Sequence, residues 1–527
     1  MLRAPDRGRT AKWRGRLSPS LSDCYFVALL AWLFAAGAGW EGLLADGDTG
    51  WHVRTGDHIV ETGSIPRRDL FSYTRPGEPW FAWEWLSDLI LAWFHRQWGL
   101  PGVTALAGVL IALAMLVLFR WMLWRGSNLF VALAVGLLAA GAASIHFLAR
   151  PHVATLLLLP LSLWAVDRDL KRTDGRVWLL VPLSVLWTNL HGGFLALPAT
   201  LAAVAAGLSL ETLRRRPGER NWRRPLRYAW LTCACGLASL LNPYGPAWHV
   251  HVARYLNSDW IRNVVMEFRS PSFRTENQLQ FEALLLGGLL VAGWRLAQGR
   301  IQESVPVVLW AHLALGSVRH APLYALVAAP VVASALSELW EKWEAKAGRG
   351  SVAAVLGAVA RDFGASRGRL TPWAAAGVAA VLWLTPDHKW PRDFPDHAFP
   401  TALVRSQASL LRQARVFTSD EWADYLIYRN WPGQRVFMDG RSDFYGPAIG
   451  DQYIALMQGQ PGWERILARH GCDVVLVPAR WPLAALLEAD PGWRLVAADH
   501  RAKLFRRTSP PTSPRGERTN LTARSYR

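Results

Sequence analysis

Residues 25–55 read YFVALLAWLFAAGAGWEGLLADGDTGWHVRT, and they contain the transition that decides the fold: an apolar run ends at Leu44 and an acidic pair follows it at once. Crossing the hydrocarbon core of a membrane takes roughly 20 apolar residues in a helix, which is the length of the run 25–44. We therefore predict a polytopic α-helical membrane protein with about 11 transmembrane helices. The predicted spans lie near 25–44, 101–119, 128–149, 152–166, 177–190, 194–210, 228–242, 280–297, 304–317, 321–337 and 371–385.

The composition agrees with this class. Of 527 residues, 51% are hydrophobic and only 19% are charged, which argues against a single soluble globular domain. The four cysteines show no CxxC spacing, which argues against a disulfide scaffold or a zinc site. The net charge of +18 comes mainly from the predicted cytoplasmic loops, above all ETLRRRPGERNWRRPLR (211–227). The basic balance is therefore a signal of topology, and we expect no nucleic acid as a partner.

The placement of Lys and Arg predicts an orientation in the cell (inner) membrane. Residues 1–24 form a basic cytoplasmic N-terminus, and 25–386 form the transmembrane domain with a first outer loop at 45–100. A change to short apolar strands and amphipathic helices then predicts a soluble, extracytoplasmic α/β domain at 387–507, followed by a disordered tail at 508–527. The alternative for the first run is a cleaved signal peptide, because LFAAGAGW offers small residues at a plausible cleavage site.

The unusual polar motifs all fall on the predicted outer face. Asp46, Asp48, Trp51 and His52 follow the first span directly, and the loop closes with a Trp-rich amphipathic stretch that we expect to lie in the membrane interface. An acid at this boundary can take a proton from an acceptor or ligate a divalent cation. Cationic or neutral donors can hold a phosphate, and the later outer segments supply Arg150, His152, His191 and Arg319 for that role.

Three stretches together resemble the C-type membrane glycosyltransferases, which use lipid-linked sugars and include protein O-mannosyltransferases and oligosaccharyltransferases. The stretch DTGWHVRT (48–55) looks like the first-loop motif of that superfamily, VVMEFRSP (264–271) is similar to an outer-loop motif of oligosaccharyltransferases, and EWADY (421–425) followed by RVFMD (435–439) looks like a degraded form of their Trp-Trp-Asp-Tyr-Gly signature. Ala423 and Leu426 depart from that signature. No carboxylate lies in the outer segment around Arg150, where the superfamily often places a second acid.

The resemblance implies an inverting glycosyltransferase of the hexosyltransferase type that moves a sugar from a polyprenyl-phosphate donor to a glycan, lipid or protein acceptor at the extracytoplasmic face. Asp48, with Asp46, takes the catalytic role as base or metal ligand. Glu267 becomes a contact to the acceptor or to a divalent cation, Mg²⁺ or Mn²⁺. Arg150, His152, His191, Arg319, His52 and Trp51 would bind the phosphate and sugar of the donor.

Two rival functions remain open at this point. A polymerase or ligase of surface polysaccharide is also polytopic and also handles lipid-linked glycans. A transporter or flippase for lipid-linked sugars is a non-enzymatic alternative, although the chain shows no internal repeat. In the outer domain, residues at the end of the predicted strand RVFMDG are surface candidates for ligand binding, together with an acid of the preceding amphipathic helix; alternatively they only build a core. These residues are Asp424, Asp439, Arg441 and Asp443.

Overall fold

The computed structural model describes residues 19–35, 39–274, 276–348, 350–364, 371–386 and 389–508. Most of the predicted N-terminal segment and the predicted tail lie outside these residues. By contacts the chain divides into two compact units. The first comprises Met1–Arg68, Glu78–Ala398 and Ser442–Phe444, and the second comprises Asp69–Gly77, Phe399–Arg441 and Tyr445–Arg527.

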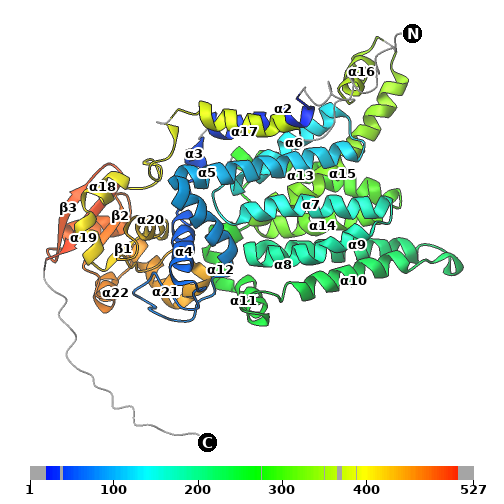
Figure 1. Cartoon of the computed structure of the whole chain (residues 1–527). Helices are drawn as coiled ribbons and strands as arrows, with labels where there is room; N and C mark the ends of the chain where they lie inside the picture. Colours follow the sequence, from blue (N-terminus) through cyan, green and yellow to red (C-terminus); the bar gives the residue numbers. More distant parts are fainter. Residues whose placement is uncertain are drawn as a thin grey trace, which may run out of the picture. The chain divides into compact units, whose positions relative to one another are not determined.

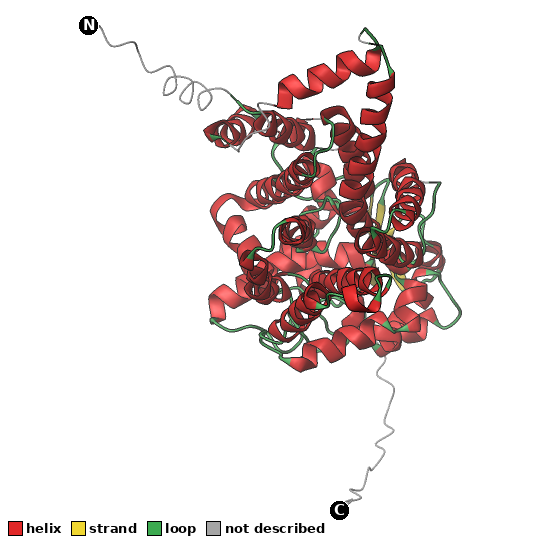
Figure 2. Ribbon diagram, turned by 90° about the vertical axis from the view of Figure 1, so that its right-hand side faces the viewer, coloured by secondary structure: helices red, strands yellow, loops and turns green. Residues whose placement is uncertain are grey.

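The first unit is built of helices, as the red ribbons of Figure 2 show. Within the described residues, helical structure coincides with each of the eleven predicted spans. Five segments of that part of the chain are long and apolar enough to cross a membrane: Trp85–Trp124, Leu129–His146, Gly192–Leu213, Gln278–Ala297 and Val318–Lys346. The helices are α2 (Leu21–Ala35), α3 (Trp40–Leu43), α4 (Thr49–Thr62), α5 (Trp85–Trp124), α6 (Leu129–Ala143), α7 (His152–Lys171), α8 (Leu180–Leu190), α9 (Ala196–Leu213), α10 (Arg223–Ala238), α11 (Pro246–Leu256), α12 (Asp259–Val264), α13 (Glu276–Ala297), α14 (Ile301–Gly316), α15 (Ala321–Lys346), α16 (Val352–Gly364) and α17 (Pro372–Leu384). Short 3₁₀ turns connect them: η1 (Ser144–His146), η2 (Gly175–Leu179), η3 (Gly192–Leu195), η4 (Pro217–Glu219), η5 (Met266–Phe268) and η6 (Val318–His320).

Helix α5 joins the predicted Trp-rich interface stretch to the predicted span at 101–119. The two halves meet at Gly99, whose φ of 65° and ψ of −156° are not helical. A residue with a side chain adopts this backbone region only at a cost, so glycine suits the kink. The Trp-rich stretch and the apolar span are therefore two helical segments that differ in direction.

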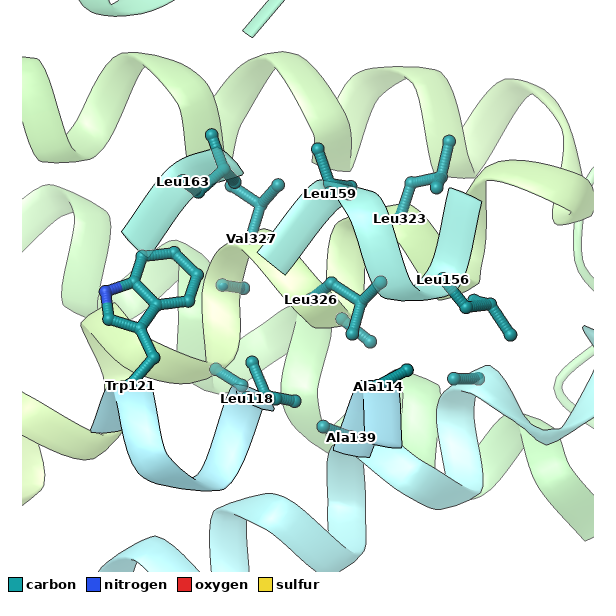
Figure 3. Packing of buried hydrophobic residues seen from close by; sticks show 14 of the residues in the cluster. Ala114, Leu118, Trp121, Ala139, Leu156, Leu159, Leu163, Leu323, Leu326 and Val327 are labelled. Carbon is teal, nitrogen blue, oxygen red and sulfur yellow. The ribbon is translucent and has the colours of Figure 1, made fainter. Parts of the chain in front are cut away.

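The core of the first unit lies among α5, α6, α7 and α15, whose buried side chains interdigitate in Figure 3. Leu118 and Trp121 of α5 pack near Leu159 and Leu163 of α7, and Leu326 of α15 lies beside them. Between membrane helices such contacts stabilise through close van der Waals packing rather than through transfer out of water. In Figure 1, α7, α8, α9, α10 and α14 run side by side in this unit.

The second unit contains a four-stranded sheet of order β1-β2-β4-β3. Strands β1 and β2 are parallel, and β4 pairs antiparallel with both β2 and β3. The predicted strands in VFTSD, CDVVLVP and WRLVAA and the predicted helix in EWADYLIYRN are present. The elements are α18 (Thr401–Ser406), α19 (Ala408–Gln413), β1 (Val416–Thr418), α20 (Asp420–Asn430), α21 (Ser442–Met457), α22 (Trp463–Arg469), β2 (Val474–Pro478), α23 (Pro482–Ala489), β3 (Trp493–Ala498) and β4 (Ala502–Arg507).

The predicted strand in RVFMDG is wrong. Val436 forms only isolated bridges, one to Ser72 and one to Val416. The bridge to Ser72 is supported by the Thr74 hydroxyl, which donates to the carbonyl of Phe437 at 2.6 Å. Residues 69–77 of the predicted first outer loop therefore belong to the second unit. They lie beside the 435–439 segment, in the place where a neighbouring strand would pair with it if that segment were a strand.

Candidate functional site

The acidic pair after the first span is held in one compact turn. The backbone N–H of Asp48, the residue before α4, donates to Asp46 Oδ1 at 2.8 Å, and the Trp51 indole N–H donates to Asp48 Oδ1 at 3.1 Å. Two hydrogen bonds join this turn to the segment that precedes α7: the Thr49 hydroxyl donates to the carbonyl of Ala149 at 3.1 Å, and the N–H of Ala149 donates to the carbonyl of Leu43 at 2.8 Å. The turn therefore lies directly beside Arg150.

Arg150 lies at the centre of three carboxylates. Its Nη1 lies 2.5 Å from Asp46 Oδ2 and 3.6 Å from Glu267 Oε1, and its Nη2 forms an ion pair with Asp48 Oδ2. The planar fork of a guanidinium suits such multiple contacts, whereas an ammonium group does not. Three predicted carboxylates from two outer segments are thus brought together around the predicted cation of a third.

The charges of this cluster shift its ionisation. Burial acts against the charged Arg150 guanidinium, but the surrounding carboxylates outweigh it and raise the pKa of Arg150 well above its ordinary value. Burial raises the pKa of Asp46 to about 6, and Arg150 opposes that rise. For Glu267, Arg150 and Arg319 outweigh burial and lower the pKa of the carboxyl. Arg150 therefore remains a fixed positive charge at any working pH.

A divalent cation does not fit this arrangement. Among the residues that the structure describes, no group of three or more His, Cys, Asp or Glu side chains is placed to hold a metal ion. The carboxylates that the sequence predicts as ligands, Asp48 and Glu267, instead contact the guanidinium of Arg150. A metal ion at this position would have to displace that cation, so no step of the chemistry is assigned to a metal.

Chelation tests this assignment. If the protein transfers a sugar, as the resemblance implies, we expect the rate of transfer to be unchanged when EDTA is present in excess over any divalent cation, because Arg150 supplies the positive charge that the acidic pair needs. Transfer that stops in EDTA and returns on addition of Mg²⁺ or Mn²⁺ alone would show that the predicted metal is required.

Arg319 is a second buried cation on the same side of the unit. Its guanidinium lies 4.4 Å from the centre of the Phe268 ring, its Nη1 is buried without a hydrogen-bond partner, and it makes no ion pair with any described residue. It is close enough to lower the pKa of Glu267. A buried guanidinium with an unused donor is suited to bind an anion such as a phosphate.

Two acids that were not predicted as site residues, Glu84 and Asp88, lie beside His52. Glu84 precedes α5, and Asp88 lies one turn further on. His52 Nδ1 lies 2.6 Å from Asp88 Oδ1, and His52 Nε2 lies 3.5 Å from Glu84 Oε2. The signal in the sequence was the i, i+4 spacing of two acids at the start of a helix within a tryptophan-rich loop, EWLSD.

A close approach of α4 and α5 sets the contact between His52 and Asp88. A methyl group added to Gly56 of α4 would overlap the backbone carbonyl of Asp88 and the side chain of Ala92 on α5. Only glycine therefore allows the two helices to pack this tightly. Gly56 follows His52 by one helical turn on α4. The separation of α4 and α5 at Gly56 therefore also sets how close the His52 imidazole comes to Asp88 on α5.

The predicted histidines differ in their contacts. His191 Nε2 lies 3.5 Å from Glu84 Oε1, which places His191 in the same group as His52. His152 Nε2 contacts the backbone carbonyl of His146 at 2.6 Å, so that ring nitrogen is already used locally. Its ring centre lies 6.3 Å from that of His191.

Aromatic rings line the same region. The rings of Trp51 and His52 lie 3.6 Å apart, and Trp83 stacks on Trp248 at 4.5 Å with an angle of 21°. Tryptophan faces suit contact with the apolar faces of sugar rings, because the indole combines a large apolar surface with one polar N–H.

The candidates of the outer domain do not form a surface site. Asp439 is 0% exposed and Arg441 is 3% exposed, so the prediction that they are surface candidates is wrong. Asp424 is also buried and accepts the backbone N–H of Gly440. Asp443, which belongs to the first unit, contacts His251 Nε2 at 3.0 Å. The residues predicted to lie at the end of a strand instead form a buried ion cluster. Val436 forms only isolated bridges, so no strand carries these side chains to a sheet edge.

A scan of protein-family models and a search of curated proteins find no match to the chain. Solved structures do match. The oligosaccharyltransferase AglB from Archaeoglobus fulgidus, in complex with an inhibitory peptide and a dolichol-phosphate, aligns with a TM-score of 0.59 and 11% identity over 92% of this chain and 73% of that protein. The Archaeoglobus fulgidus oligosaccharyltransferase in complex with zinc and sulfate aligns with a TM-score of 0.52 and 10% identity, over 87% and 68%. ArnT from Cupriavidus metallidurans aligns with a TM-score of 0.48 and 14% identity, over 94% and 98%.

At these identities the likeness to the two archaeal structures concerns the fold. The predicted resemblance is confirmed at that level, since the matches extend over 92% and 87% of this chain. The described part of the chain has five segments suited to cross a membrane and a small C-terminal sheet, and the chain shares the C-type glycosyltransferase fold of these membrane proteins.

Proposed function

We propose that the protein transfers a sugar from a polyprenyl-phosphate donor to an acceptor hydroxyl at the extracytoplasmic face of the cell membrane, with inversion at the anomeric carbon. The observation that carries this proposal is the cluster of Asp46, Asp48 and Glu267 around Arg150, with the buried guanidinium of Arg319, whose Nη1 has no hydrogen-bond partner, nearby. The fold supports it, because a neighbour with the same fold was solved with a dolichol-phosphate.

The charged groups of this cluster have separate roles in the proposed transfer. Arg319, with its unused Nη1, binds the donor phosphate, and Arg150 adds a fixed positive charge beside it. Negative charge grows on this phosphate as the glycosidic bond breaks, so cations held in advance stabilise the transition state more than the ground state. Asp46 and Asp48 hold Arg150 in position. The pH profile of Asp48→Asn tests the prediction that Asp48 itself takes a proton from the acceptor.

The remaining details of the proposal come from the sequence. The predicted orientation places the N-terminus in the cytoplasm and the acidic loop outside. The sugar is proposed to be a hexose, and the acceptor a glycan, lipid or protein. Trp83, which is half-buried, offers a face against which a sugar ring stacks, whereas Trp51 and Trp248 are buried and pack against His52 and Trp83.

The test is transfer by Asp48→Asn. Membranes that contain the protein are given radiolabelled polyprenyl-phosphate hexoses and pentoses, and labelled glycan, lipid and protein products are separated. We expect the wild type to transfer label and Asp48→Asn to lose about 100-fold or more of the rate, because the neutral amide no longer positions Arg150.

Glu61→Gln is the matched control. Glu61 is a carboxylate on α4 whose side chain is 56% exposed and pairs with Arg96, away from the acidic pair. It should leave transfer unchanged. Equal rates for wild type and Asp48→Asn would remove the acidic pair from the reaction, and absence of any transfer by the wild type with every donor would contradict the proposed function.

A further inference from the structure

The carboxylate oxygens of Glu84 make few contacts within the protein, whereas both oxygens of Asp48 make close ones. Both Asp48 oxygens are engaged, one by the Trp51 indole N–H and the other by Arg150. Glu84 receives one long hydrogen bond, from the backbone N–H of Gly192 at 3.4 Å, and otherwise faces two imidazole rings at 3.5 Å. Its side chain is 12% exposed, whereas His52 and Asp88 are each 1% exposed. His191 is 15% exposed. Of the two acids in this group, Glu84 is thus the one that a substrate can reach.

The tautomer of His191 can be assigned from its neighbours. The backbone N–H of Gly193 donates to Nδ1 at 3.0 Å, so Nδ1 is an acceptor. The Thr155 hydroxyl also lies 2.7 Å from Nδ1, and it accepts the Trp187 indole N–H at 2.8 Å, which leaves its own hydrogen for His191. The ring hydrogen of neutral His191 is therefore on Nε2, which faces Glu84 Oε1. His191 offers a donor to the ionised form of Glu84.

His52 presents the opposite character to the other oxygen. His52 Nδ1 and Asp88 Oδ1 lie 2.6 Å apart and share one hydrogen. When that hydrogen is on Nδ1 and Asp88 is ionised, the Nε2 lone pair of His52 faces Glu84 Oε2 at 3.5 Å. Burial, Arg150 and His191 lower the pKa of His52 well below its ordinary value, which favours the neutral ring. A proton carried on Oε2 of Glu84 therefore has an acceptor directly opposite.

We propose that Glu84 is the general base of the transfer, held between His191 and the His52–Asp88 pair so that it can exist both ionised and protonated. This rests on the proposed function and assigns the acidic residue of the first loop that takes the proton. His52, Asp88 and His191 are positioning residues, since they act on the acceptor through Glu84.

The step balances in atoms and charge. The acceptor O–H bond breaks and its proton passes to Glu84 Oε2, while the acceptor oxygen forms a bond to the anomeric carbon. The bond from that carbon to the phosphate oxygen breaks, and the polyprenyl phosphate leaves with the electron pair towards Arg319. Glu84 then releases the proton to water before the next cycle.

The ionisation of Glu84 agrees with this role. Burial raises its pKa to about 7, and Arg150 and the Gly192 N–H oppose that rise. A base of this pKa is half ionised at neutral pH and is therefore suited to both accept and release a proton. The titratable and charged groups that face Glu84 from the surrounding segments are Asp48, His52, Asp88, Arg150, His191 and Arg319.

The first experiment compares the pH profile of transfer in four proteins: the wild type, Glu84→Gln, Asp48→Asn and the control Glu61→Gln. In the wild type, kcat/KM should fall about tenfold per pH unit below about pH 7, because only ionised Glu84 accepts a proton. Glu84→Gln should lose about 100-fold or more of the rate at pH 8, and its residual rate should lack this acid limb. The Glu61→Gln control should retain both rate and limb. A limb that persists unchanged in Glu84→Gln overturns the proposal, and its loss in Asp48→Asn instead would assign the base to Asp48.

A second measurement is independent of any donor sugar. Infrared difference spectra of the purified protein, recorded as a function of pH, should show a protonated carboxyl band that titrates near pH 7 and is missing in Glu84→Gln. In His191→Ala the Glu84 carboxyl should titrate at higher pH, because ionised Glu84 loses the N–H donor of His191. His191→Gln, whose amide can also donate, should move the titration part of the way back. A wild type without this band overturns the proposal even if it transfers sugar. A wild type that shows the band and transfers no sugar overturns the proposed function.

Discussion

Replacement of Arg150 by glutamine should abolish transfer and lower the free energy of unfolding of the first unit by on the order of 3 kcal/mol. The guanidinium is the shared partner of Asp46, Asp48 and Glu267, and these side chains are largely buried apart from Glu267. Glutamine leaves the carboxylates close together without a counter-charge. The loss should become smaller as the pH falls towards 5, because protonation of Asp46, whose pKa is already raised, relieves the repulsion.

Thermal unfolding of the detergent-solubilised protein measures this effect. Arg176→Gln is the control, since Arg176 is 76% exposed and its pair with Asp174 spans 3.9 Å, an arrangement worth little. Combining Arg150→Gln with Asp46→Asn and Asp48→Asn should restore most of the stability but none of the transfer. If Arg150→Gln unfolds like Arg176→Gln, the cluster contributes nothing to the fold and its charges are not coupled.

Replacement of Arg441 by glutamine should unfold the second unit at physiological temperature. Arg441 contacts Asp69 Oδ1 at 2.7 Å and both oxygens of Asp439 at 2.6 and 2.7 Å, and the Tyr445 hydroxyl donates to Asp439 at 2.7 Å. The two carboxylates raise the pKa of Arg441 well above its ordinary value, despite burial. Removal of one partner of such a buried cluster typically costs about 3–5 kcal/mol.

Limited proteolysis and circular dichroism measure the unfolding of the second unit. Arg441→Gln should be cleaved rapidly within residues 399–508, whereas Arg435→Gln, at an exposed position of the same unit, should resist cleavage like the wild type. The triple replacement of Arg441, Asp69 and Asp439 by Met, Asn and Asn should recover much of the resistance. Equal cleavage of the two single variants would show that Asp69 and Asp439 tolerate the loss of their cation.

The apolar runs made the helices predictable, because each run of sufficient length needs a helix to satisfy its backbone inside a membrane. Three of four strands in the second unit followed from the same kind of pattern. RVFMDG did not, because its potential partner segment, residues 69–77, lies far away in the sequence and meets it at only one bridge.

The acidic pair and Arg150 could be named from the sequence, but their ion pairs could not. They depend on the placement of Ala149 and Thr49 by hydrogen bonds between segments about a hundred residues apart. Glu84 was missed for the same reason: its character comes from burial and from two histidines of other segments. The sequence shows only an acid before a helix, which is a common solvated helix start.

The close approach at Gly56 also has a use in recognising relatives of this protein. The contact between His52 and Asp88 requires a residue without a side chain four positions after the histidine, and Glu84 must precede Asp88 by four positions to face His52. A chain that uses the same proton acceptor therefore has to carry His-x-x-x-Gly in its first outer loop and Glu-x-x-x-Asp where that loop ends. This paired pattern can be searched in sequences too divergent for overall alignment, and it separates chains that retain the base from chains that share only the fold.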